Sequence, residues 1–538
     1  MIKNITLVQN GIAKRLAFEE QIGTVVLDSI SLLSSSSVPF DIRFELEKPI
    51  QKIRNHAYEW EAFTQNCVAN TFHPKIVQLI DGTYLQANIT HGIWELDASK
   101  PLELLWRFQL PAASLLTAYS GPKCVKTIIA AHQINDFPAM PTLVWSTANA
   151  LEFSRSKIPF AAVVCFTDHC DFDTPTNMKV QREFFLSKNI TTTKGFFLNH
   201  FSKRSDNISF EREPQVLLEW KNDGHELCYH SLSQSIKKEE DSWNDFASFE
   251  PPFPSISTWI DHGFQSYNLS LYKNQGKDDA FFSTTMHQKG ITTFWNYIDS
   301  GIATKGVINQ LNANQFTLEH YYKGIKNQPL AERLGKMVKM ILFHHYDNEK
   351  LISNYQDLAA EIKKVVYEKK IKSIGSLIKK TFSLLIPLGK VIFGWKTQKK
   401  KPFKNATYAP LVFKHYINER PYYIFQTIEM NDFINGLHPS NIDLLIKEKG
   451  ICIAHTYFSL PMEYHKGRFL SNENKINNAV VPNFDYLSQK IKTNQIWNPT
   501  LKALIEYLSE FEKIVIQVDE KGSLFVSSTI EIPNRYIQ

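Results

Sequence analysis

The chain has 538 residues, of which 43% are hydrophobic and 21% are charged, and its formal net charge is +6. This composition is typical of a folded globular protein and excludes disorder over most of the length, while the length itself indicates two or three domains. The charge is too small to indicate nucleic-acid binding by itself.

Cysteine usage and the first residues bear on the compartment. Six cysteines are scattered along the chain without a CxxC pair, which favours reduced thiols over a disulfide framework. The opening MIKNITLVQNGIAKRL contains no apolar run long enough for a signal peptide. We therefore expect a cytoplasmic protein, either free or associated with the inner face of the membrane.

Residues 1–150 carry short apolar runs that are interrupted by turn signals. In IVQLIDGTYLQANITHGIWEL, Asp81 and Gly82 form a typical hairpin turn between two such runs. The pattern predicts a β-rich amino-terminal domain of unknown role. We expect this domain to be separable, with a protease-sensitive linker near residues 148–156.

The remaining sequence alternates between strand and helix patterns. Over 151–301, apolar segments such as FAAVVCFTD alternate with helical ones such as MKVQREFFLSKN, which predicts a parallel sheet or an α/β barrel. A helix-rich stretch follows over 302–445, and the earlier pattern returns over 446–538. We therefore expect a barrel in two parts, separated by a helical insertion and followed by a carboxy-terminal hairpin.

The segment VVCFTDHCDFDTP, residues 163–175, ends a buried apolar strand in Asp168, Asp171 and Asp173. Unpaired carboxylates are costly to bury, so something must compensate their charge. One interpretation is a solvated turn rich in aspartate. The other is a metal or acid–base site at the carboxyl end of a barrel strand.

Four further segments place polar or aromatic residues near the end of an apolar run. Each feature is common in ordinary cores and caps, so the order of the segments carries more information than any one of them. The segments are NDGHELCYHSLSQ with His230 and Gln234, PPFPSISTWIDHGF with Trp259 and His262, TTFWNYIDSG with Trp295 and Asp299, and GICIAHTYF with His455 and Tyr457.

In this order the segments resemble the polysaccharide deacetylases, the NodB-homology domain of carbohydrate esterase family 4. The resemblance rests on FTDHCDFD, GHELCYHSLSQ, EPPFPSISTW, FWNYIDSG and ICIAHTY, and it spans residues 155–300 and 448–512. It implies a distorted (β/α) barrel that removes an N-acyl or O-acyl group from an amino sugar, a polysaccharide or a lipid-linked glycan intermediate. It also implies one divalent metal, with zinc favoured over cobalt, nickel or manganese.

The resemblance assigns roles in catalysis and substrate binding. Asp168 would be the general base, His455 would protonate the leaving group, and Asp299 would be a further catalytic residue. A carboxylate base beside a metal suits this reaction, because the metal polarises the acyl carbonyl and acidifies water. The substrate-binding positions would be Trp259, His262, Trp295 and Tyr457.

The resemblance also assigns metal ligands, with one departure from the family pattern. Asp171 would bind the metal with His230, and Asp173 is an alternative to Asp171. Gln234 stands where the family has a second histidine, and glutamine is a poorer ligand than imidazole for zinc-like ions.

Another side chain could supply the missing nitrogen, and the candidates are His225, His262 and His169. The proline-rich loop PPFPS also lacks the arginine that the family usually has there. An active deacylase and a catalytically impaired glycan-binding or scaffold protein therefore both stay open.

The insertion combines an apolar segment with clustered lysines, SLIKKTFSLLIPLGKVIFGW followed by KTQKKKPFK. Pro387 and Lys390 interrupt the apolar run, which is too short to span a bilayer. One hypothesis is an interfacial anchor on anionic lipid, formed by residues 376–404. The alternative is a core helix pair with a solvated basic loop. We expect no nucleic-acid partner, because no aromatic strand platform accompanies the lysines.

Overall fold

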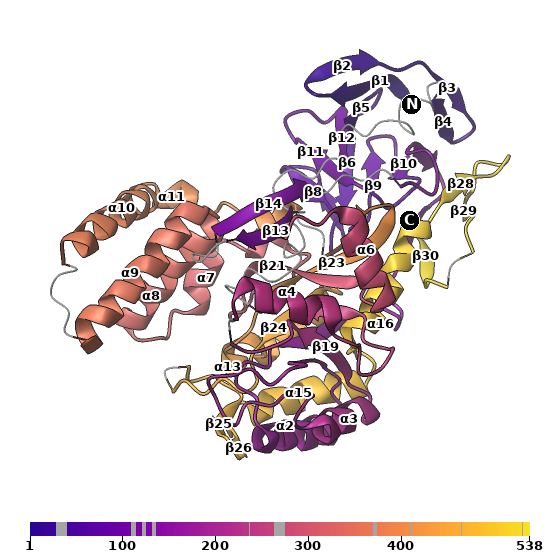
Figure 1. Cartoon of the computed structure of the whole chain (residues 1–538). Coiled ribbons are helices and arrows are strands. Elements are labelled where there is room, and N and C mark those ends of the chain that lie inside the picture. The colour runs from indigo at the N-terminus through magenta and orange to yellow at the C-terminus, as the bar shows by residue number, and fades with distance from the viewer. Residues whose placement is uncertain are drawn as a thin grey trace.

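The computed structural model describes residues 1–27, 40–108, 115–120, 125–131, 136–235, 237–262, 275–368, 374–408, 411–463, 465–529 and 531–538. These residues form an amino-terminal β sandwich, a parallel barrel and a helical lobe that extends from the barrel (Figure 1).

Two antiparallel sheets make the sandwich, in the orders β2-β1-β5-β12-β11-β8 and β3-β4-β15-β10-β9-β6-β7. In β5 (Phe40–Leu46) alternate residues are buried, as expected for a strand with one face on the core. The other strands are β1 (Ile2–Gln9), β2 (Ile12–Arg15), β3 (Phe18–Gln21), β4 (Thr24–Leu27), β6 (Ile50–Arg54), β7 (Trp60–Ala62), β8 (Cys67–Ala69), β9 (Ile76–Leu79), β10 (Tyr84–Ala87), β11 (Ile93–Leu96), β12 (Glu103–Arg107) and β15 (Leu143–Ser146); β13 (Leu115–Ser120) and β14 (Val125–Ala131) form a separate hairpin.

Within the described residues, seven parallel strands close into a barrel in the order β17-β18-β19-β20-β21-β23-β24, and β24 pairs back with β17. Every residue of β17 is buried, because a parallel strand of a barrel is covered on both faces. The predicted α/β barrel is therefore confirmed. Its strands are β17 (Ala162–Asp168), β18 (Thr193–Phe196), β19 (Glu226–His230), β20 (Thr258–Ile260), β21 (Thr293–Ile302), β23 (Arg420–Glu429) and β24 (Ile451–Thr456).

Helices cover the outside of the barrel. Val164 and Phe166 of β17 belong to the same apolar core as Met178 and Phe185 of the first helix. The covering helices are α2 (Pro175–Lys188), α3 (Pro214–Asn222), α4 (Glu239–Ser248), α6 (Asp279–Gln288), α13 (Phe433–Gly436), α14 (Pro439–Lys447) and α15 (Val481–Lys492), and the short strands nearby are β25 (Leu470–Asn472), β26 (Lys475–Ile476) and β27 (Ile496–Trp497).

Helix α16 (Leu501–Ser509) fills the amino end of the barrel. Its Leu501 shares a core with Val163, which lies on the opposite face of β17 from Val164. The carboxylate of Glu226 fixes the start of this helix by accepting the backbone N–H of Lys502 at 2.9 Å. A filled amino end leaves the carboxyl ends of the strands as the place for a site.

The helical lobe lies between β21 and β22 (Val412–Ile417) and is shorter than the insertion predicted over 302–445. Strand β23 belongs to the barrel and forms a hairpin with β22. Lys339 of the lobe pairs with Glu429 at the end of β23, at 3.5 Å. The elements of the lobe are the 3₁₀ helix η1 (Ala313–Gln315), α7 (Leu318–Gly324), α8 (Leu330–Met340), the π-helix η2 (Ile341–His345), α9 (Glu349–Glu368), α10 (Ile374–Phe393), α11 (Trp395–Gln398) and α12 (Lys404–Tyr408).

None of the helices in the described part of the chain has the length and apolar character needed to cross a membrane.

The carboxy-terminal segment joins the barrel to the sandwich. After the 3₁₀ helix η4 (Glu510–Lys513), β28 (Ile516–Val518) and β29 (Leu524–Val526) form the predicted hairpin, which packs against β15. The last strand, β30 (Asn534–Ile537), pairs with β16 (Ala150–Phe153). The end of the amino-terminal region, at β15 and β16, and the last residues of the chain thus meet at one seam.

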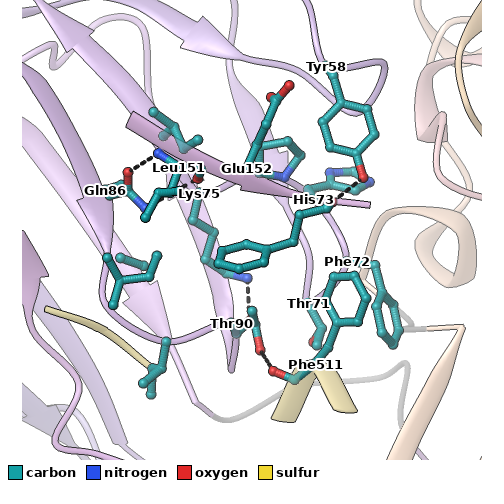
Figure 2. Close-up of a pocket in the computed structure, with 16 residues that line it drawn as sticks. Tyr58, Thr71, Phe72, His73, Lys75, Gln86, Thr90, Leu151, Glu152 and Phe511 are labelled. Carbon is teal, nitrogen blue, oxygen red and sulfur yellow. Dashed lines mark hydrogen bonds between the residues drawn. The ribbon is translucent and has the colours of Figure 1, made fainter. Parts of the chain in front are cut away.

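Side-chain contacts cross this seam (Figure 2). Lys75 donates to the carbonyl of Thr90 at 2.6 Å, and the hydroxyl of Thr90 donates to the carbonyl of Phe511 at 2.6 Å. They border a small cavity of about 40 Å³. Ser154 and Ser156 are fully buried. Ala148 is exposed, but residues 150–156 are buried. Most of the linker expected at residues 148–156 is therefore not exposed, because the segment is packed between the sandwich and the barrel.

Candidate metal centre

The carboxyl ends of the barrel strands bring four of the polar side chains together. His169 and Asp171 directly follow β17, His230 is the last residue of β19, and His262 follows β20. Parallel barrel strands all end at the same mouth, so residues that are far apart in the sequence become neighbours there.

Asp171 lies at the centre of this cluster. Its Oδ2 is 3.1 Å from Nε2 of His230, and its Oδ1 contacts Nε2 of His262. One ligand atom from each of His169, Asp171 and His230 lies within 4.8 Å of the other two. The three side chains are thus close enough to share one metal ion, and His262 is placed to join them.

Local backbone structure fixes His230 and His262. Nδ1 of His230 lies 3.3 Å from the carbonyl oxygen of Ile260, which assigns the proton to Nδ1 and turns Nε2 toward Asp171. Ser231 adopts the left-handed conformation with φ of 52°, and its hydroxyl accepts the backbone N–H of His262 at 2.9 Å. Such strain is held only where the surrounding structure imposes it.

Gly195 of β18 allows the two neighbouring strands to approach. A Cβ atom at this position would lie 2.6 Å from the carbonyl oxygen of Asp168 and 3.4 Å from Cβ of His230. The backbone oxygen cannot move out of the way, so a larger residue would push His230 away from β17.

The electrostatics of the cluster suit a divalent cation. Burial lowers the pKa of His169 and of His230, so both imidazoles are neutral near neutral pH. Burial opposes ionisation of Asp171, but the neighbouring His262 and His230 keep the pKa of this carboxyl well below its usual range. Zinc-like ions prefer a carboxylate with neutral imidazoles.

An unsatisfied atom also fits a metal. Nδ1 of His169 is buried and has no hydrogen-bond partner among the described residues. A buried polar nitrogen without a partner is costly. A metal bound beside Asp171 would give this nitrogen a partner, so the residues present fit the metal implied by the sequence.

His455 and Asp299 form a dyad next to the cluster. Nδ1 of His455 is 3.3 Å from both carboxylate oxygens of Asp299, and the ring stacks on His169 with the centroids 4.0 Å apart. Burial disfavours the charged ring, but the carboxylate of Asp299 leaves the pKa of His455 raised. Nε2 of His455 has no hydrogen-bond partner in the described part of the chain, so the dyad can carry a proton at this atom.

Two of the predicted substrate-binding aromatics border the cluster. The ring of Trp295 lies 4.9 Å from His169 and 4.8 Å from His455, and the ring of Tyr457 lies 4.9 Å from His169. Tyr457 is only partly buried, so it stands where a substrate at the mouth of the barrel could touch it. Trp295 is 4% exposed and belongs to the apolar interior of the barrel, so it supports the cluster from below.

Trp259, another predicted substrate-binding residue, lies elsewhere. Its side chain is only 3% exposed and packs with Tyr229 and Phe246 in the core between the barrel and its helices. Its Nε1 donates to Asp261 at 2.9 Å. The structure thus corrects the expectation for Trp259, which is a core residue because it points outward from β20.

The predicted base, Asp168, is part of a buried ion triad. Lys194 pairs with Asp168 and also with Asp173, at 2.8 Å, and all three side chains have no exposed surface. Oδ1 of Asp168 accepts the hydroxyl of Thr456 at 3.0 Å and the backbone N–H of Phe458 at 2.9 Å. The structure therefore gives Asp168 a structural environment in place of the accessible position expected for a base.

The triad also shows which of the two alternative metal ligands, Asp171 or Asp173, is already bound to a cation of the chain. Asp173 is held by Lys194 and by the hydroxyl of Ser459, whereas Asp171 faces the histidines. Of the two aspartates, Asp171 is the one that the structure brings to the candidate metal centre.

The structure gives Gln234 other partners. Its Oε1 accepts the hydroxyl of Ser202 at 3.0 Å and the hydroxyl of Ser235 at 2.9 Å. The additional nitrogens at Asp171 come from His169 and His262. His225 instead accepts the backbone N–H of Thr192 at 3.1 Å, away from the cluster. Position relative to the strands is the distinguishing signal, since His225 precedes β19 whereas His169 and His262 follow β17 and β20.

Comparison with protein families finds no model that matches the chain, and comparison with curated proteins finds no match either. Among solved structures, a xylosidase from Aspergillus niger is similar over 56% of this chain and 43% of its own, with 12% sequence identity and a TM-score of 0.20. The match spans less than half of the xylosidase, and its TM-score is too low to support an argument about fold or function.

Proposed function

We propose that the protein is a metal-dependent hydrolase of the polysaccharide deacetylase type, which removes an acyl group from an amino sugar, a polysaccharide or a lipid-linked glycan. The observation that carries this proposal is the cluster of Asp171 with three histidines beside the dyad of His455 and Asp299. The order of the sequence segments and the parallel barrel support the same assignment.

In this proposal Asp171, His169, His230 and His262 hold the ion. When bound, a divalent metal would polarise the acyl carbonyl and lower the pKa of water. The carboxylate of Asp171 and the neutral imidazoles of His169 and His230 would meet the ion without first losing a proton.

The dyad would perform the proton transfers. Asp299 holds Nδ1 of His455, so the lone pair or proton at Nε2 is presented to the mouth of the barrel. His455 could take a proton from the attacking water and deliver it to the leaving amine or hydroxyl. Asp168 would then be a positioning residue, because serving as base would require it to leave Lys194.

An open pocket of about 570 Å³ on the rim supports a glycan substrate. Leu198 of the pocket lining directly follows Phe197, whose buried ring lies 5.3 Å from the ring of His230. Aromatic faces mixed with charged groups suit the two sides of a sugar ring. The lining includes His200, Phe201, Phe210, Glu211, Lys237 and Glu250.

The test measures metal and product on the same preparation. Protein stripped with a chelator and reloaded with zinc should bind the ion stoichiometrically and release acetate from acetylated oligosaccharides. His455→Ala should keep the zinc but lower acetate release by about 100-fold or more, the usual scale of general acid–base catalysis.

Gln234→Ala is the matched control, and it should keep both zinc and activity because the Oε1 that would bind a metal accepts two serine hydroxyls instead. Failure of the wild-type protein to bind zinc, cobalt, nickel or manganese would overturn the proposal in favour of a glycan-binding scaffold. Loss of zinc in Gln234→Ala but not in His262→Ala would overturn the ligand set.

A further inference from the structure

We propose that the helical lobe docks on an anionic membrane surface through one side of α10 and the lysines that follow it. The inference is independent of the proposed enzymatic function. It rests on the exposure of an apolar helix face, on the charge around that face, and on the repulsion that another copy of the chain would meet there.

The apolar surface is the outer face of α10, defined by Phe382, Leu385, Ile386, Ile392 and Phe393. These side chains are 63%, 51%, 65%, 65% and 94% exposed, respectively. They are spaced so that they lie on the same side of a helix. A contiguous exposed apolar face of this kind usually marks an interaction site.

The opposite side of α10 packs against the rest of the protein. Leu384 and Val391 are buried. Val391 belongs to the apolar core around the outside of the barrel, and Leu388 packs against that core. Their spacing of three and four residues places them about half a turn away from the outer face. The stability of the lobe therefore does not explain why the outer face is apolar.

The charged residues within this segment of the sequence are all of one sign. Residues 374–404 contain eight lysines and no aspartate or glutamate. Near an anionic bilayer each lysine close to the surface contributes about 1 kcal/mol. The exposed lysines on α10 and directly after it are Lys390, Lys396, Lys400, Lys401 and Lys404.

The charge also decides between a membrane and a second copy of the chain. Two outer faces packed together would bring two sets of lysines into proximity, and like charges across an interface are repulsive. Anionic headgroups beside acyl chains match both features at once. Apolar insertion and lysine attraction together supply the two signals that stable membrane association needs.

Co-sedimentation of the full chain with vesicles tests this proposal. We expect binding to vesicles of phosphatidylcholine mixed with phosphatidylserine at least tenfold stronger than to phosphatidylcholine alone, with loss of binding at high salt. Two variants should each lower the binding at least tenfold, namely the triple serine variant of Phe382, Ile386 and Phe393 and the triple glutamate variant of Lys396, Lys400 and Lys401.

A charge-matched control carries glutamate at Lys14, Lys492 and Lys521, which are exposed outside the lobe, and it should bind like the wild type. All substituted side chains are exposed, so the unfolding midpoint should not change. Equal binding to neutral and anionic vesicles, or full binding by the triple serine variant, would overturn the proposal. A stable dimer that this variant dissociates would show that a second copy covers the face.

Discussion

The aspartates at the end of β17 and in the loop that follows it lie in two different environments. Asp168 and Asp173 share the buried cation Lys194 and have no exposed surface, whereas the side chains that Asp171 contacts among the described residues are the imidazoles of His230 and His262. Where the chain supplies its own cation, the carboxylates become part of the structure. Where it supplies imidazole rings instead, the site fits a cation from outside. The contrast turns one aspartate-rich segment into a structural half and a candidate metal-binding half.

Removing the internal cation should have the largest effect. Lys194→Met would leave two buried carboxylates without a cationic partner, and we expect a loss of about 3–5 kcal/mol in the free energy of unfolding, measured with urea. Lys188→Met is the control, because its pair with Asp485, at 2.5 Å, is partly exposed and should cost less than about 1 kcal/mol. Equal losses in the two variants would contradict the structural role of the triad.

Neutralising one aspartate on each side should separate metal binding from stability. Asp171→Asn should weaken zinc binding about 100-fold or more, measured by competition with a chromogenic chelator. Asp173→Asn should keep the zinc affinity and lower the free energy of unfolding by about 1–3 kcal/mol, because Lys194 loses a charged partner. If both variants lost zinc to the same extent, the division of the loop would be wrong.

Lys75 extends the comparison to a buried lysine whose hydrogen-bond partners in the described part of the chain are backbone carbonyls. Burial lowers its pKa from 10.5 to about 7, so above pH 7 the unfolded chain binds more protons than the folded one. Stability should then rise with pH, by about 2 kcal/mol between pH 7 and 9 relative to Lys75→Met. Urea unfolding of both proteins at the two pH values measures this difference, and parallel pH profiles would refute it.

The barrel could be predicted because each strand and each helix has a recognisable pattern within its own short segment of sequence. The sequence pattern places β23 in the insertion, because the expected alternation of strand and helix is missing there. A tight turn, and not a helix, joins β22 to β23. This turn has Asn418 and Glu419 at positive φ, and it lacks the glycine that usually reveals such a hairpin. The seam was missed because β16 pairs with β30 from the far end of the chain.

The candidate site could be predicted where a strand end alone determines the position. Asp171, His230 and His455 meet at the mouth of the barrel because parallel strands end there. The environment of Asp168 depends on Lys194, a residue on another strand. The orientation of Trp259 depends on which face of a three-residue strand points inward. Long-range partners and strand faces of this kind are not visible in a single sequence.

The place where the lobe leaves the barrel has a consequence for how a substrate would be found. Strand β21 ends at the mouth, and Lys339 ties the lobe to the end of β23 there. A lobe resting on a bilayer would hold the mouth within a fixed reach of the lipid plane. For a substrate anchored in that plane, enzyme and substrate would find each other by diffusion in two dimensions. The effective substrate concentration at the mouth would then depend on the distance between the mouth and the bilayer, and not on the concentration in bulk solution. Turnover would then follow the density of substrate in the membrane surface.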